Sequence, residues 1–133
     1  MPPRSARATW IATAVLGALA TVAFAAGKDD WGRPVTEPTA DAAYYYAYLP
    51  SLVLDGDLDL ANQYRVTGNW YRLGRTPLGR PGNVFGIGPA VFALPAFAVG
   101  HGLARLAGAQ DDGFSRWETA LVLWTSIPMS LGA

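Results

Sequence analysis

Apolar residues gather in three blocks along the chain, and polar segments separate the blocks. The first covers 9–26 without a charged side chain, the second covers 84–106, and the third covers 118–133. At a rise of 1.5 Å per residue, about 18 helical residues extend roughly 27 Å, close to the apolar thickness of a thin bilayer. The pattern predicts an all-α membrane protein with transmembrane helices at 9–26 and 84–106 and the beginning of a third at 118–133.

The first block has a second interpretation. Arg4 and Arg7 precede it, and Ala23-Phe24-Ala25 has the small-x-small form of a signal-peptide cleavage site. The second block favours the membrane interpretation, because an exported soluble protein has no need of another long apolar segment. Both alternatives stay open for 9–26, and a buried helix of a soluble protein is the alternative for 84–106.

Basic residues next to the apolar blocks predict the orientation. Such residues collect on the cytoplasmic side of a membrane, and here they are Arg4, Arg7, Arg105 and Arg116. We therefore expect residues 1–8 and 107–117 in the cytoplasm and residues 27–82 outside, as in a bacterial inner-membrane protein. The third block is too short to cross a bilayer before Ala133, so we also expect the chain to be the N-terminal piece of a longer polytopic protein.

The expected external loop contains a helical pattern. Residues 41–54 carry apolar and aromatic side chains at helical spacing, interrupted by Pro50 and followed by Asp55-Gly56. This predicts an amphipathic helix on the membrane surface. Its tyrosines suit the headgroup layer, where the ring is buried and the hydroxyl is hydrated; they are Tyr44, Tyr45, Tyr46 and Tyr48. Residues 67–83 are rich in Gly and Pro and predict an irregular loop.

The composition and charge of the chain exclude several kinds of partner and active site. Hydrophobic residues make up 51% of the chain, the net charge is zero and there is no Cys. Zero net charge without a basic block argues against nucleic acid as a partner. The absence of Cys excludes disulfides, thiolate metal sites and a Cys nucleophile. No serine-hydrolase elbow, phosphate-binding glycine loop or zinc-ligand spacing is present. His101 is a lone His near the end of an apolar block, and the sequence assigns it no role.

An acidic cluster, Asp55, Asp57 and Asp59, follows the expected surface helix. Alternating carboxylates around Gly56 can converge on a divalent cation. The alternative is a turn that starts a short helix through Leu60, because Asp is a common N-cap residue. The sequence indicates no definite cofactor.

Three stretches carry a resemblance to a known family. They are Asp41-Ala-Ala-Tyr-Tyr-Tyr-Ala-Tyr-Leu-Pro-Ser-Leu, Asp55-Gly-Asp-Leu-Asp-Leu-Ala-Asn62 and Arg80-Pro-Gly-Asn83-Val-Phe-Gly-Ile-Gly-Pro89. With the apolar first block before them, they resemble the start of bacterial polytopic glycosyltransferases of the C-type superfamily, of the protein-mannosyltransferase type. The resemblance covers residues 9–133, which correspond to the N-terminal portion of such an enzyme.

The resemblance implies transfer of a sugar from a polyprenyl-phosphate donor to an acceptor hydroxyl at the outer membrane face. An Asp early in the first external loop is the general base in this family, and Asp41 is the matching position. The family often has a second acid beside that Asp, whereas Ala40 and Ala42 stand here. Asp55, Asp57 and Asp59 are therefore alternates for the acid or metal role. By charge alone, Arg72, Arg75 and Arg80 are candidates for binding phosphate.

Two functions remain open from the sequence. The first is the N-terminal part of this membrane glycosyltransferase, which we expect to be inactive without later helices. The second is a small non-enzymatic membrane or exported protein. Its loop, rich in Asp and Tyr, would bind a lipid headgroup, a cation or a protein partner. Membrane lipid is a partner in both, and the polyprenyl-phosphate-linked sugar is a partner in the first.

Overall fold

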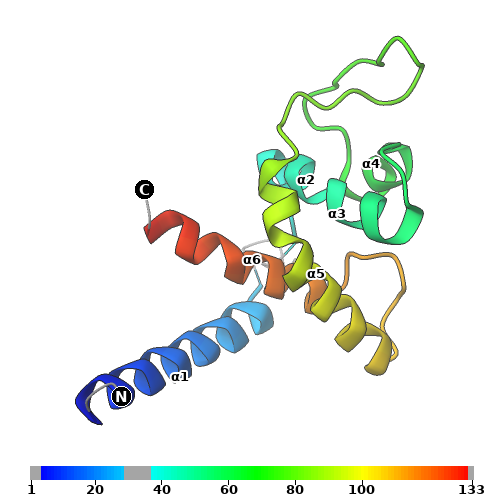
Figure 1. Cartoon of the computed structure of the whole chain (residues 1–133). Coiled ribbons are helices and arrows are strands. Elements are labelled where there is room, and N and C mark those ends of the chain that lie inside the picture. The colour runs from blue at the N-terminus through cyan, green and yellow to red at the C-terminus, as the bar shows by residue number, and fades with distance from the viewer. Residues whose placement is uncertain (1–3, 29–36, 132–133) are drawn as a thin grey trace. The chain divides into compact units, whose positions relative to one another are not determined.

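The computed structural model of the chain describes residues 4–28 and 37–131 (Figure 1). The chain divides into two units, one before residue 37 and one from residue 37 onward. The described residues are mostly helical and form no strand, which confirms the all-α class. The helices are α1 (Arg4–Ala26), α2 (Ala40–Tyr46), α3 (Tyr48–Pro50), the π-helical turn η1 (Ser51–Asp55), α4 (Ala61–Thr67), α5 (Gly88–Leu106) and α6 (Arg116–Leu131).

One helix of the described residues, α5, is long and apolar enough to cross a membrane. It begins at Gly88 with Pro89 in its first turn, four residues after the start expected at 84. The first unit contains α1, whose described apolar stretch, Ala8–Leu19, is shorter. The expectation of two transmembrane helices is therefore supported at α5 and not at α1.

The second unit is organised by the crossing of α5 and α6. A Cβ atom added to Gly100 of α5 would lie 2.7 Å from the Cα atom of Glu118 and 2.8 Å from the carbonyl oxygen of Trp117. A real Cβ atom does not come so close to backbone, so only glycine allows this crossing. The core beside it contains Tyr46, Leu49, Ala90, Ala93 and Phe97.

We expect Gly100→Ala to destabilise the second unit by about 1–3 kcal/mol, the usual cost of overpacking. Gly102→Ala is the matched control, because nothing lies within 4 Å of a Cβ atom added there. Both variants replace glycine by alanine in α5. Denaturant unfolding in detergent micelles would compare them, and equal stability of the two variants would contradict the close crossing.

The segment expected as a surface helix folds as α2, α3 and η1 in succession. The segment ends at Asp55, and Gly56 follows with φ of 68°, at the end expected from Asp55-Gly56. The membrane-surface role for its tyrosines is wrong for Tyr44 and Tyr46, which are 0% and 5% exposed. Other parts of the same unit cover these rings, so protein rather than lipid headgroups surrounds them.

Tyrosine hydroxyls connect this helical segment to the loops that follow it. Tyr46 donates a hydrogen bond to the carbonyl oxygen of Gly113 at 2.6 Å, and Tyr48 donates to that of Phe85 at 3.0 Å. Burial raises the pKa of Tyr46, and the nearby carboxylates of Glu118 and Asp112 raise it further. Each hydroxyl thus has the partner that a buried polar group requires.

Candidate functional site

Asp41, the residue matched to a general base, lies in the first turn of α2 and is exposed. Its Oδ1 atom accepts a hydrogen bond of 2.5 Å from the hydroxyl of Tyr71. Its Oδ2 atom has no hydrogen-bond partner among the described residues. Within the described part of the chain, the exposed carboxylate thus has one oxygen held by Tyr71 and one oxygen without a hydrogen bond.

Tyr71 lies in the loop that follows α4 and is held in turn by Tyr44 of α2. Its backbone N–H donates to the hydroxyl oxygen of Tyr44 at 2.7 Å, and that hydroxyl donates to Oδ1 of Asn69 at 2.8 Å. The Tyr71 ring stacks on the rings of Tyr44 and Phe85, with centroids 5.4 and 6.0 Å away. The position of the Tyr71 hydroxyl is thus fixed by backbone and ring contacts together.

Backbone strain occurs directly beside both members of this hydrogen bond. Ala40 precedes Asp41 and has φ of 48°, and Arg72 follows Tyr71 and has φ of 50°. These are the two non-glycine residues in the described chain with positive φ. Such conformations cost roughly 1–3 kcal/mol each and gather at functional sites. The strain singles out the contact between Asp41 and Tyr71 from the other polar contacts of the loop.

The three candidate phosphate-binding arginines are all exposed but differ in their partners. Arg75 donates from Nη1 to the carbonyl oxygen of Gly79 at 2.7 Å, and Arg80 lies 4.0 Å from a carboxylate oxygen of Asp59. The Arg72 guanidinium has no hydrogen bond or ion pair within the described part of the chain. Since Arg72 directly follows Tyr71, it is the cation of the three that the sequence order brings nearest to the Asp41 contact.

The acidic cluster forms a turn and the start of a helix. Oδ2 of Asp55 accepts hydrogen bonds from the side-chain amides of Asn62 and Gln63, at 2.8 and 2.6 Å. Oδ1 of Asp57 accepts from the backbone N–H of Asp59 at 3.0 Å, and Oδ1 of Asp59 accepts from that of Ala61 at 3.2 Å. In the described ranges, no three acidic, His or Cys side chains are grouped to hold a metal. The turn alternative is thus what forms, and the metal alternative gains no support.

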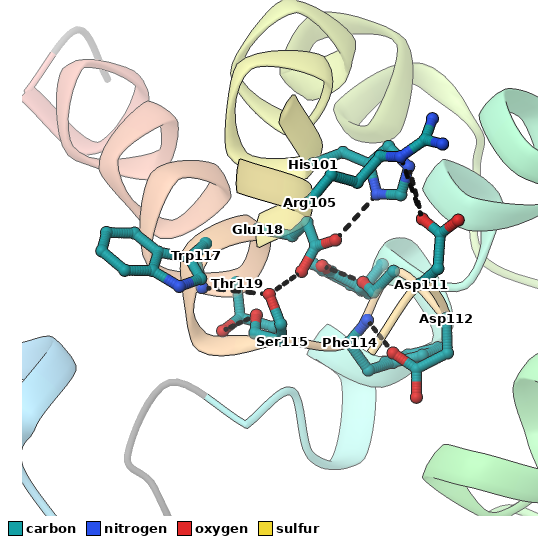
Figure 2. Close-up of polar contacts among 11 residues, drawn as sticks. His101, Arg105, Asp111, Asp112, Phe114, Ser115, Trp117, Glu118 and Thr119 are labelled. Carbon is teal, nitrogen blue, oxygen red and sulfur yellow. Dashed lines mark hydrogen bonds and ion pairs between the residues drawn. The ribbon is translucent and has the colours of Figure 1, made fainter. Parts of the chain in front are cut away.

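A second polar cluster lies where α5 meets α6 and was not expected from the sequence (Figure 2). Nδ1 of His101 lies 2.9 Å from Oε1 of Glu118, and its Nε2 lies 3.0 Å from Oδ1 of Asp111. Ser115 donates to Oε2 of Glu118, and Nε of Arg105 lies 3.9 Å from Asp111. The Glu118 side chain is fully buried, and that of His101 is 12% exposed.

This cluster links three parts of the second unit. His101 belongs to α5, Glu118 belongs to α6, and Asp111 lies in the connection between them. Each ring nitrogen of His101 has one carboxylate within hydrogen-bond distance, so the ring bridges α6 and the connecting segment. His101 and Ser115 together give the buried Glu118 side chain the partners that a buried polar group requires.

Sequence reasoning missed Tyr71 and the partners of His101. One local signal was present for the latter: Ser115-Arg-Trp-Glu118 has the Ser-x-x-Glu form of a capping box before an apolar run. It places Glu118 in the first turn of a helix, where the structure has it. No local signal exists for Tyr71, which is 30 positions from Asp41.

Comparison with known proteins gives no match to a family model, to a curated protein or to a solved structure. An exposed carboxylate with one held oxygen and one open oxygen can accept a proton from a substrate hydroxyl. An exposed guanidinium without a protein partner can bind a phosphate.

Proposed function

We propose that the chain is the N-terminal part of an integral-membrane glycosyltransferase, which transfers a sugar from a polyprenyl-phosphate donor to an acceptor hydroxyl. The observation that carries the proposal is the exposed Asp41 carboxylate, with Oδ1 held by Tyr71 and Oδ2 without a hydrogen bond among the described residues. In this proposal Oδ2 of Asp41 takes the proton of the acceptor hydroxyl. The hydroxyl oxygen of the acceptor attacks the anomeric carbon of the sugar at the same time. The bond from that carbon to the phosphate oxygen breaks, and the polyprenyl phosphate leaves.

Arg72 supports the proposal because it is a candidate for stabilising the leaving group, the polyprenyl phosphate. A departing phosphate gains negative charge, which a guanidinium stabilises by charge-assisted hydrogen bonds. Arg75 and Arg80 already face a carbonyl and a carboxylate of their own surroundings. Arg72 is therefore the first choice of the three for the donor phosphate.

The exposed surface of α5 supports a membrane location. The helix has 19 residues, which extend roughly 28 Å, close to the apolar core of a bilayer. Only 28% of its apolar window is buried within the protein, whereas the core helix of a soluble protein is mostly buried. Large apolar side chains remain exposed along it, namely Val91, Phe92, Val99, Leu103 and Leu106. In this proposal lipid covers them.

The proposal extends to a second membrane helix and to an orientation. The large apolar side chains that the structure describes in α1 include exposed ones, such as Trp10, Ile11 and Leu16, which suits a lipid environment. Arg4 and Arg7 before α1 favour the cytoplasmic side of a bacterial inner membrane. In this proposal Asp41 lies on the outer side with α2, where the lipid-linked sugar is used. The expected cytoplasmic position of residues 107–117 is not kept, because Gly113 of this connection accepts the Tyr46 hydroxyl of α2.

The test is sugar transfer in membranes that contain the protein expressed from its full gene. Labelled polyprenyl-phosphate mannose or glucose serves as the donor, and released polyprenyl phosphate together with a labelled acceptor is the expected product. A donor that binds without any release of polyprenyl phosphate would instead support the non-enzymatic binding function. No binding and no transfer with either donor would contradict the proposal.

A further inference from the structure

We infer that Tyr71 is a positioning residue for Asp41: its hydroxyl fixes one carboxylate oxygen so that the other stays open toward the acceptor. This inference rests on the proposed function, because it concerns the same carboxylate. Tyr71 itself need not touch the substrate. Its role is to restrict the rotation of the Asp41 side chain, which on an exposed first turn would otherwise sample several rotamers.

Two residues of α2 hold Tyr71 at two points. Asp41 and Tyr44 are three positions apart and therefore lie on the same face of the helix. Asp41 accepts the Tyr71 hydroxyl, whereas the Tyr44 hydroxyl accepts the Tyr71 backbone N–H. Tyr44 is 0% exposed, so this second point is anchored in the core. A residue held at both its backbone and its hydroxyl has little freedom left.

Asn69 fixes the loop around Tyr71. Its Oδ1 atom accepts from the Tyr44 hydroxyl and from the backbone N–H of Leu73, and its Nδ2 atom donates to the carbonyl oxygen of Leu73. The backbone N–H of Arg72 donates to the carbonyl oxygen of Asn69 at 2.9 Å, which closes a turn across Tyr71. These hydrogen bonds offset the free-energy cost of the positive φ at Arg72, so the loop keeps a backbone conformation that is unfavourable for a non-glycine residue.

The hydroxyl can be tested separately from the ring. The stacking of Tyr71 on Tyr44 and Phe85 uses the ring face, so Tyr71→Phe keeps the packing and removes one hydrogen bond. The bond to Asp41 also raises the pKa of Tyr71, because ionisation of the phenol would break the bond and place two negative charges together. The pKa of the Tyr71 phenol can therefore be used to detect the hydrogen bond to Asp41 in the absence of substrate.

The first arm of the experiment measures the titration of Tyr71 in the full chain in detergent micelles, by NMR of 13Cζ-labelled tyrosine. Tyr71→Phe assigns the resonance. We expect Tyr71 to ionise above the ordinary tyrosine value of about 10, and Asp41→Asn to lower that pKa. Tyr45→Phe is the control, because the Tyr45 hydroxyl has no hydrogen bond among the described residues, and it should leave the Tyr71 titration unchanged. Identical titration of Tyr71 in the wild type and in Asp41→Asn would overturn the inference.

The second arm measures transfer kinetics in membranes with the protein from its full gene. We expect Tyr71→Phe to lower kcat by roughly ten- to a hundredfold, since small misplacements of a catalytic group have effects of this size. The KM for the donor should change less than about twofold, because Tyr71 holds the base and not the donor. A Tyr71→Phe enzyme with the wild-type kcat would overturn the inference.

The two arms separate the two hypotheses. A raised Tyr71 pKa that depends on Asp41, in a protein that transfers no sugar, would leave the contact standing. It would refute the proposed function, and the positioning role in transfer with it. An active enzyme that loses transfer in Asp41→Asn but not in Tyr71→Phe would support the function and refute the positioning role alone.

Discussion

Asp41→Asn is expected to lower the rate of sugar transfer by roughly a hundred- to ten-thousandfold, the usual contribution of a general base. Asparagine has nearly the same shape and keeps an oxygen that can accept the Tyr71 hydroxyl. It cannot take a proton from the acceptor at neutral pH. The variant should therefore fold and insert as the wild type does, and initial rates at equal protein amounts in membranes would measure the loss.

Asp55→Asn is the matched control for this substitution. Asp55 is also an exposed carboxylate, but its Oδ2 atom accepts hydrogen bonds from Asn62 and Gln63. We expect this variant to transfer sugar at close to the wild-type rate. If Asp55→Asn lost transfer and Asp41→Asn kept it, the base would lie in the acidic turn and not at the start of α2.

His101→Ala is expected to destabilise the second unit by about 1–3 kcal/mol, because it leaves one oxygen of the buried Glu118 side chain without its hydrogen-bond partner. Glu118 is 0% exposed and cannot turn to solvent without opening the crossing of α5 and α6. Ser115 still donates to the other oxygen of Glu118, but it does not replace the lost contact with His101. Denaturant unfolding in micelles would measure the change.

Asp111→Asn is the control for the His101 cluster. Asp111 contacts the other ring nitrogen at 3.0 Å, but its side chain is 59% exposed. Exposed ion pairs contribute about 0–1 kcal/mol, so this variant should be less destabilised than His101→Ala. Equal stability of His101→Ala and the wild type would contradict the buried contact between His101 and Glu118.

Local patterns in the sequence predict a large part of the fold. Helical spacing and the positions of Gly and Pro predict helices at 41–54 and 118–133, the irregular loop at 67–83, and a helix end at Asp55-Gly56. They do not indicate what covers an apolar face. The tyrosines of α2 look alike in the sequence whether lipid or protein surrounds them, and the structure buries Tyr44 and Tyr46 in protein. Burial depends on contacts with residues far along the chain, which spacing does not contain.

In the candidate site, too, the sequence predicts local features but not contacts between residues that are far apart in the chain. Asp41 was identified from the resemblance of its surroundings to a family, and its position at the start of a helix is a local property. Its partner Tyr71 is 30 positions away, and the pair of His101 and Glu118 is separated by 17. Both pairs depend on how segments pack. Asn69 binds the Tyr44 hydroxyl and so holds the loop that carries Tyr71, and Gly100 allows the close approach of the two helices that carry His101 and Glu118. The capping-box pattern at Ser115 to Glu118 indicates where Glu118 lies in its helix, but no local pattern pairs it with His101 or pairs Asp41 with Tyr71.

Photo-cross-linking with a diazirine-bearing polyprenyl phosphate, followed by mass spectrometry, would test directly whether this chain binds the lipid donor at Asp41. The protein is placed in vesicles of bacterial lipids, and unlabelled polyprenyl phosphate competes with the probe. We predict cross-links at residues 70–72 and at the start of α2, lost on competition and weakened in Arg72→Ala. Cross-links spread along α5 alone, or unaffected by the competitor, would contradict a donor site beside Asp41.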